Sequence, residues 1–161
     1  MIRIVIQEDQ QLLRETMSSL LNLEDDMEVV GQASGIQDSQ TLIQKLKPDL
    51  FIMDIEMLER DGPLEAGCPL LVLTTFAKKG YRDKVEQAGA RGYLLKDSPS
   101  DELTSSIRNI MGGMKVYSSK LNIAEEESRE CTSYEIPRTP KPVKKNYITM
   151  VINKMKLPTG S

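Results

Sequence analysis

The sequence predicts an α/β protein built on a doubly wound sheet of five parallel strands, followed by a short helical C-terminal extension. Up to about residue 118, short apolar runs alternate with segments of helical period, which is the pattern of a parallel sheet covered by helices. The apolar runs are mostly Ile, Val and Leu, as strands buried on both faces require. With 161 residues and 39% hydrophobic content, the chain suits one well-packed domain and an extension.

The predicted strands and helices alternate along the chain. Apolar runs are expected to form strands at residues 2–7, 27–33, 50–55, 70–75 and 92–95. Amphipathic stretches are expected to form helices at residues 10–21, 37–46, 79–88 and 101–111. Asp9 and Ser100 are the expected N-caps of the first and last of these helices. The connection between the third and fourth strands contains Gly62, Pro63 and Gly67, so its helix is expected to be one short turn or absent.

Beyond residue 118 the composition changes. Residues 119–142 begin with a glutamate-rich run and continue with prolines among basic residues, which predicts a linker after a folded domain at residues 1–118. In residues 143–157, apolar residues recur at helical spacing among lysines and asparagines. That spacing predicts one amphipathic, basic helix.

The composition also excludes several kinds of chemistry. The chain has no histidine, which rules out Ser-His-Asp and Cys-His catalysis, and Cys68 and Cys131 form neither a C-x-x-C pair nor a disulfide framework. A net charge of −3 gives no whole-chain electrostatic footprint for nucleic acid. No segment approaches the roughly 18 apolar residues of a membrane span. The N-terminus shows no cleavage-site pattern, so a cytoplasmic protein without membrane insertion is expected.

Polar residues follow four of the predicted strands. In a doubly wound sheet, ligands bind at the carboxyl ends of the strands, where the strand order reverses. The residues at these ends are Glu8, Asp9, Asp54, Thr74, Thr75 and Lys96. Three carboxylates held together repel one another and suit a hard divalent cation such as Mg²⁺. Asp54 stands where a carboxylate nucleophile toward phosphorus belongs, with a lysine and a hydroxyl to neutralise the transferred oxygens.

Four segments in this order resemble the receiver domain of two-component response regulators, and the NarL/LuxR-type subfamily most closely. The segments are Glu8-Asp9, MDIEM around Asp54, LTTF and GYLLKDSPS. The resemblance covers about residues 1–118 and implies a flavodoxin-like (CheY-like) fold. It implies that Mg²⁺ is bound by Glu8, Asp9, Asp54 and the backbone carbonyl of Glu56.

The same resemblance implies the other roles at the site. Asp54 is the implied phosphoacceptor, and Thr74 and Lys96 are the implied contacts of the phosphoryl oxygens. Tyr93 matches the switch aromatic of the family, which moves inward when Thr74 is drawn to the phosphate. A sensor histidine kinase would supply the phosphoryl group, and the switch would control homodimerisation and transcriptional output. The chain would be no enzyme beyond its own Mg²⁺-dependent phosphorylation and dephosphorylation.

Two segments depart from the family pattern. After Asp54, Leu58 stands where related receivers have a proline, and the connection is several residues short. The segment VKKNYITMVINKMKL is similar to the DNA-recognition helix of NarL/LuxR-type output domains, and that match implies that Lys145, Asn146 and Thr149 face DNA. The four-helix output domain is several times longer, which argues against sequence-specific DNA binding. The alternative is a helix that packs on the receiver or on a second copy.

Other interpretations stay open at this point. Taken singly, Glu8 and Asp9 could cap a helix, and Asp54 and Lys96 could be ordinary turn residues, but their joint arrangement favours a site. The chain could instead be a receiver-like protein-interaction module without phosphorylation or DNA binding. A phosphatase with an aspartyl nucleophile would need an aspartate at the position of Glu56. A flavodoxin-like cofactor binder would need a phosphate-cradling loop after the first strand.

Overall fold

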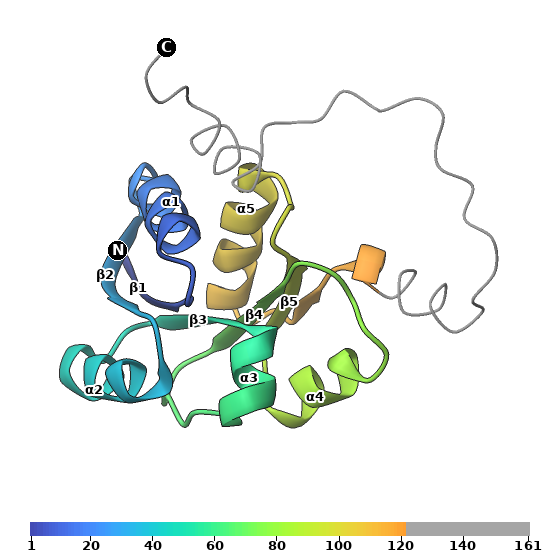
Figure 1. Cartoon of the computed structure of the whole chain (residues 1–161). Coiled ribbons are helices and arrows are strands. Elements are labelled where there is room, and N and C mark those ends of the chain that lie inside the picture. The colour runs from blue at the N-terminus through green and yellow to red at the C-terminus, as the bar shows by residue number, and fades with distance from the viewer. Residues whose placement is uncertain (122–161) are drawn as a thin grey trace, which may run out of the picture.

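A computed structural model of the chain describes residues 1–121, which form a parallel sheet with the strand order β2-β1-β3-β4-β5-β6 (Figure 1). Its strands are β1 (Ile2–Gln7), β2 (Met27–Ala33), β3 (Leu50–Asp54), β4 (Leu70–Thr74), β5 (Gly92–Leu95) and β6 (Val116–Tyr117). The first five confirm the predicted doubly wound sheet. The sixth, two residues long, was not predicted and pairs with β5 at the edge of the sheet.

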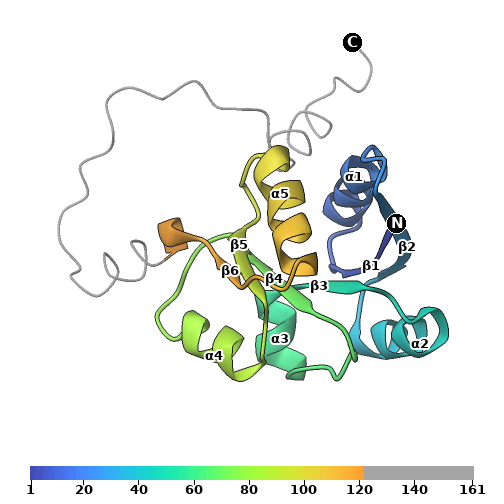
Figure 2. The same ribbon diagram turned by 180° about the vertical axis from the view of Figure 1, so that it is seen from behind.

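Helices cover both faces of the sheet (Figures 1 and 2). They are α1 (Gln11–Asn22), α2 (Ile36–Leu46), α3 (Ile55–Asp61), α4 (Tyr81–Gln87) and α5 (Ser100–Met111). One apolar cluster joins the sheet to α1 and α5, and a second joins it to α2, α3 and α4. Within residues 1–121, no helix combines the length and the apolar character that crossing a membrane requires. The helix predicted at residues 143–157 and most of the predicted linker lie outside the described residues.

The third connection corrects one expectation. Instead of one turn or none, it contains α3, a helix of seven residues that begins directly after β3. The Asp54 side chain caps this helix, and its apolar residues Ile55, Met57 and Leu58 are buried. The poor helix formers do not oppose this helix because they follow it: Gly62, with a φ of 78°, is its C-cap. Ile55 consequently belongs to α3 and not to the strand.

The predicted N-caps were also wrong. The residue before α1 is Gln10 and the residue before α5 is Pro99, and neither makes a side-chain capping hydrogen bond. Asp9 is one residue too early for this role, and Ser100 is already the first helical residue of α5. Periodicity locates a helix to within a residue or two, and here that margin decides which residue is the cap.

The alternation of side chains along the strands positions the candidate site. Ile6, Ile52 and Leu94 pack on the α1 and α5 face of the sheet. Successive side chains of a strand point to opposite faces, so the residues two positions later point to this same face. Those residues are Glu8, Asp54 and Lys96, each at the carboxyl end of its strand. β1 and β3 are neighbours in the sheet, and only β4 separates β3 from β5.

Candidate functional site

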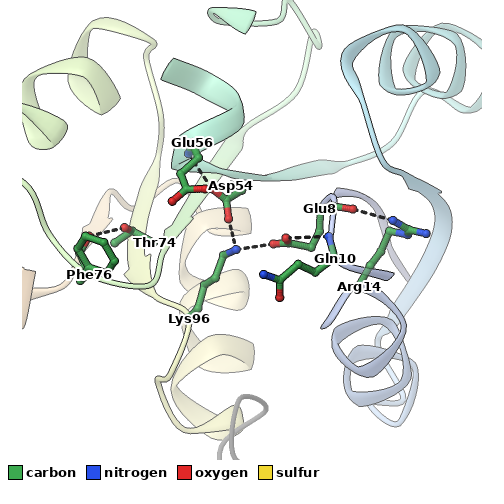
Figure 3. Close-up of polar contacts among 8 residues, drawn as sticks. All are labelled: Glu8, Gln10, Arg14, Asp54, Glu56, Thr74, Phe76 and Lys96. Carbon is green, nitrogen blue, oxygen red and sulfur yellow. Dashed lines mark hydrogen bonds and ion pairs between the residues drawn. The ribbon is translucent and has the colours of Figure 1, made fainter. Parts of the chain in front are cut away.

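Three charged side chains from distant parts of the sequence meet at the carboxyl edge of the sheet. The ammonium nitrogen of Lys96, after β5, lies 2.5 Å from Oε2 of Glu8, after β1, and forms a second ion pair with Oδ2 of Asp54 at the end of β3. Figure 3 shows Lys96 reaching between the two carboxylates. Glu8, Asp54 and Lys96 expose only 2%, 7% and 4% of their surface. The structure thus brings together three of the residues that the sequence predicted to share a site.

This cluster carries an excess negative charge. One ammonium group faces two carboxylates and offsets only one of their two charges, and burial makes the remaining charge costly. Desolvation raises the pKa of Glu8 above its ordinary value, although the neighbouring Lys96 acts in the opposite direction. The site therefore favours the arrival of additional positive charge.

Backbone contacts fix the orientation of both carboxylates. Oδ1 of Asp54 accepts a hydrogen bond of 2.6 Å from the Glu56 N–H, in the first turn of α3, which leaves Oδ2 facing Lys96. The Gln10 N–H donates to Oε1 of Glu8 at 3.3 Å. Arg14, on α1, donates from Nη1 to the backbone carbonyl of Glu8 at 2.7 Å (Figure 3). Both carboxylates are therefore held by the start of the helix that follows their strand.

Arg14 is a residue of the site that was not predicted from the sequence. It occupies the second turn of α1, six residues after Glu8, on a helix that also packs apolar residues against the sheet. The sequence did contain a signal for this residue. Arg14 is a basic residue beside the apolar stripe of a predicted helix, about one turn after a candidate strand end.

The donor set suits a hard cation such as Mg²⁺. Oxygens of Glu8 and Asp54 already converge on one cationic nitrogen, and carboxylate and carbonyl oxygens are the ligands that Mg²⁺ prefers. Asp9 and Glu56 are exposed beside the buried pair. Among residues 1–121, no group of three or more acidic or cysteine side chains is already gathered around one point. The chemistry of these described residues therefore fits a magnesium ion.

The predicted switch residues lie next to this cluster. Thr74, 1% exposed at the end of β4, donates its hydroxyl to the backbone carbonyl of Phe76 at 2.6 Å, so the hydroxyl is turned away from Asp54 (Figure 3). Its own carbonyl accepts the Lys96 N–H at 2.7 Å. Tyr93, on β5, is buried in the cluster that joins the sheet to α4. Thr75 is exposed, and Lys145, Asn146 and Thr149 lie outside the described residues.

Comparisons with known proteins agree with this geometry. A family model described as the response regulator receiver domain matches residues 4–108. The transcriptional regulatory protein DesR of Bacillus subtilis is 51% identical over 128 residues, which cover 75% of this chain and 64% of DesR. YvfU, a transcriptional regulatory protein of the same organism, is 44% identical over 138 residues, covering 80% of this chain and 69% of YvfU. This chain therefore spans about two thirds of the length of these relatives.

A solved structure gives the same result at the level of the fold. The crystal structure of a LuxR-family DNA-binding response regulator from Staphylococcus aureus superposes with a TM-score of 0.60 at 26% identity, and the match covers 69% of this chain and 99% of that one. Three observations indicate the same family: the polar residues at successive strand ends, the buried Glu8–Lys96–Asp54 cluster and the sequence matches. The chain is a two-component response regulator of the receiver domain family, related to the NarL/LuxR-type transcriptional regulators.

Proposed function

We propose that this chain is a switch operated by phosphorylation of Asp54. The observation that carries the proposal is the position of the Asp54 carboxylate, with one oxygen held by the Glu56 N–H and the other directed at the Lys96 ammonium group. A carboxylate oxygen held in place beside a cation that can neutralise the transferred oxygens suits an in-line attack on phosphorus. Oδ2 is the proposed nucleophile because Oδ1 is engaged by the backbone.

The proposed reaction transfers one phosphoryl group. Oδ2 of Asp54 attacks the phosphorus atom of the donor, the bond from phosphorus to the leaving group breaks, and the leaving group keeps the electron pair. The product is an acyl phosphate on Asp54. Lys96 then moves its ammonium group from the carboxylate to an oxygen of the transferred group, and the Thr74 hydroxyl exchanges the Phe76 carbonyl for another of these oxygens.

Receiver domains generally use Mg²⁺ for this chemistry. Here Glu8, Asp9, Asp54 and the Glu56 backbone carbonyl would hold the ion, whose charge would stabilise the developing negative charge on the phosphoryl oxygens. Arg14 and the Gln10 N–H keep Glu8 oriented toward the same point. In this proposal, the chain catalyses only its own phosphorylation and dephosphorylation.

A response regulator implies a cognate histidine kinase, and we propose such a kinase as the phosphoryl donor. DesR and YvfU are transcriptional regulatory proteins, which supports transcriptional output as the proposed consequence. Homodimerisation on phosphorylation stays a prediction from the sequence. DNA contacts by Lys145, Asn146 and Thr149 remain a prediction from the sequence.

Intact-mass spectrometry after incubation with acetyl phosphate and Mg²⁺ tests the proposal. We expect one phosphoryl adduct on the wild type, its complete loss in Asp54→Asn, and its loss when EDTA is added first. Asp83→Asn is the matched control, because Asp83 is an exposed aspartate on α4, away from the site, and this variant should be phosphorylated like the wild type. An unmodified wild type under all conditions would instead favour the protein-interaction module.

A further inference from the structure

Large apolar side chains are exposed at the amino edge of the sheet, opposite the candidate site. Leu23, which follows α1, is 77% exposed, and Met114, which precedes β6, is 56% exposed. Met1, directly before β1, is exposed as well. Among residues 1–121, the fourth such side chain, Phe76, lies at the carboxyl edge after β4. Single exposed side chains of this size are common, but three at one edge indicate a contact surface.

Partly buried apolar residues and an ion-pair bridge connect these side chains. Figures 1 and 2 show α1 and α5 side by side on one face of the sheet. Leu20 of α1 and Met111 of α5 pack on the apolar cluster beneath both helices. The Arg108 guanidinium group, on α5, reaches the loop after α1 and pairs with Glu24 at 2.7 Å and Asp26 at 2.9 Å. The apolar residues of this surface are here called the amino-edge patch: Met1, Leu20, Leu23, Met111 and Met114.

The amino-edge patch borders an acidic loop. Glu24, Asp25 and Asp26 follow one another between α1 and β2. Arg108 offsets one of these three negative charges, and the Asp25 side chain, between its two partners, is exposed. The segment that fits this surface would therefore combine apolar side chains with positive charge.

Residues 143–157 of the same chain have this composition. No aspartate or glutamate occurs in residues 136–161. A single amphipathic helix is marginal in water unless another surface covers its apolar face. The segment and the amino-edge patch therefore complement each other in charge and in apolar character. Residues 143–157 contain four lysines, and their apolar residues at helical spacing are Tyr147, Ile148, Val151, Ile152 and Met155.

We propose that residues 143–157 dock as a helix on the amino-edge patch of the same chain, with their lysines beside the acidic loop. The connecting residues 122–142 are long enough, since they span up to about 70 Å when extended, whereas a domain of this size is about 35 Å across. A link of this length gives an effective concentration in roughly the millimolar range. Contact within one chain therefore outcompetes contact with a second copy at micromolar protein concentrations.

Photo-cross-linking of the full, unphosphorylated chain tests this inference. The photoreactive residue is introduced as Leu23→p-benzoylphenylalanine, and this chain is mixed with an equal amount of ¹⁵N-labelled wild type before irradiation. Peptide masses then show whether both cross-linked peptides come from one chain. We expect cross-links from position 23 to residues 143–157 that contain only unlabelled peptides. Phe76→p-benzoylphenylalanine is the matched control, because Phe76 is 54% exposed at the opposite edge and should give no such cross-link.

Two results of this experiment would overturn the inference. The first is the absence of cross-links between position 23 and residues 143–157. The second is a cross-linked segment that is ¹⁵N-labelled at least as often as unlabelled, which would assign the contact to a second copy. Neither result depends on whether Asp54 accepts a phosphoryl group, so failure of this inference is distinguishable from failure of the proposed function.

Hydrogen–deuterium exchange of peptides from residues 143–157 measures how strongly the segment docks. Leu23→Ser removes an apolar side chain that docking would bury, and we expect exchange of the segment to become about ten times faster. Phe76→Ser is the matched control and should leave this exchange unchanged. Equal exchange of the segment in Leu23→Ser and the wild type would contradict docking on the amino-edge patch.

A charge variant tests the contribution of the acidic loop. Asp25→Lys should raise exchange of residues 143–157 about threefold at low salt, and the effect should shrink in about 0.5 M NaCl. Asp83→Lys reverses the charge of an exposed aspartate on α4 and should have no effect on this segment. Exchange in Asp25→Lys that equals the wild type at low salt would contradict the placement of the lysines beside the acidic loop.

Discussion

A Lys96→Met variant is expected to lose about 3 kcal/mol of unfolding free energy in the absence of divalent cations at pH 7. The substitution keeps a side chain of similar length but removes the ammonium group that pairs with both Glu8 and Asp54. Two buried carboxylates would then lack a counterion, and an unpaired buried charge costs far more than a lost surface ion pair. Urea unfolding of the wild type and the variant, in buffer containing EDTA, measures the difference.

Lys84→Met is the matched control for this experiment. Lys84 pairs with Glu59 at 2.9 Å, but both side chains are nearly half exposed, and such pairs contribute about 0–1 kcal/mol. In the double variant Glu8→Gln/Lys96→Met, one of the two unpaired charges is gone, so the loss should be smaller than in Lys96→Met alone. A Lys96→Met variant as stable as the wild type would contradict the electrostatic description of the cluster.

The Lys96→Met variant should also bind Mg²⁺ at least about ten times more tightly than the wild type, which corresponds to about 1.4 kcal/mol of binding free energy. In the structure the Lys96 ammonium group occupies the position on which Glu8 and Asp54 converge, so it competes with any metal ion for these oxygens. Removal of the competitor leaves two carboxylates free to bind the metal, and the stability lost in EDTA should largely return at saturating Mg²⁺. Isothermal titration calorimetry measures the affinities directly.

Two further variants of the chain serve as references for the magnesium affinity. Lys84→Met should bind Mg²⁺ like the wild type, since Lys84 lies away from the cluster and pairs with Glu59. Asp54→Asn should bind it more weakly because it removes one charged ligand. Equal affinities of Lys96→Met and the wild type would show that the metal does not take the place of the ammonium group.

The sheet and the charged cluster could be predicted because both depend on simple periodicities. Buried parallel strands appear in the sequence as apolar runs, and Glu8, Asp54 and Lys96 each follow such a run. The rule that ligands gather at the carboxyl ends of parallel strands then placed these residues at one edge. The structure adds that Lys96 lies between the two carboxylates, which no spacing in the sequence could reveal.

The errors concern features that depend on tertiary packing. The seven residues of α3 are stabilised by the Asp54 cap and by burial of Met57 and Leu58, whereas the nearby glycines suggested that the helix was short or missing. The strand β6 is too short to show any period, and it forms because β5 offers unpaired backbone groups next to it. The Arg14 hydrogen bond to the Glu8 carbonyl is likewise a contact between a helix and a loop that sequence periodicity does not encode.

The most direct test of the central claim is to locate the phosphoryl group on the chain. Borohydride reduces an acyl phosphate on an aspartate to homoserine and releases phosphate, so treatment of the phosphorylated protein followed by tandem mass spectrometry identifies the modified residue. We expect homoserine at position 54 and at no other aspartate of the chain. An adduct that resists borohydride, or homoserine at Asp9 instead of Asp54, would contradict the assignment of Asp54 as the phosphoacceptor.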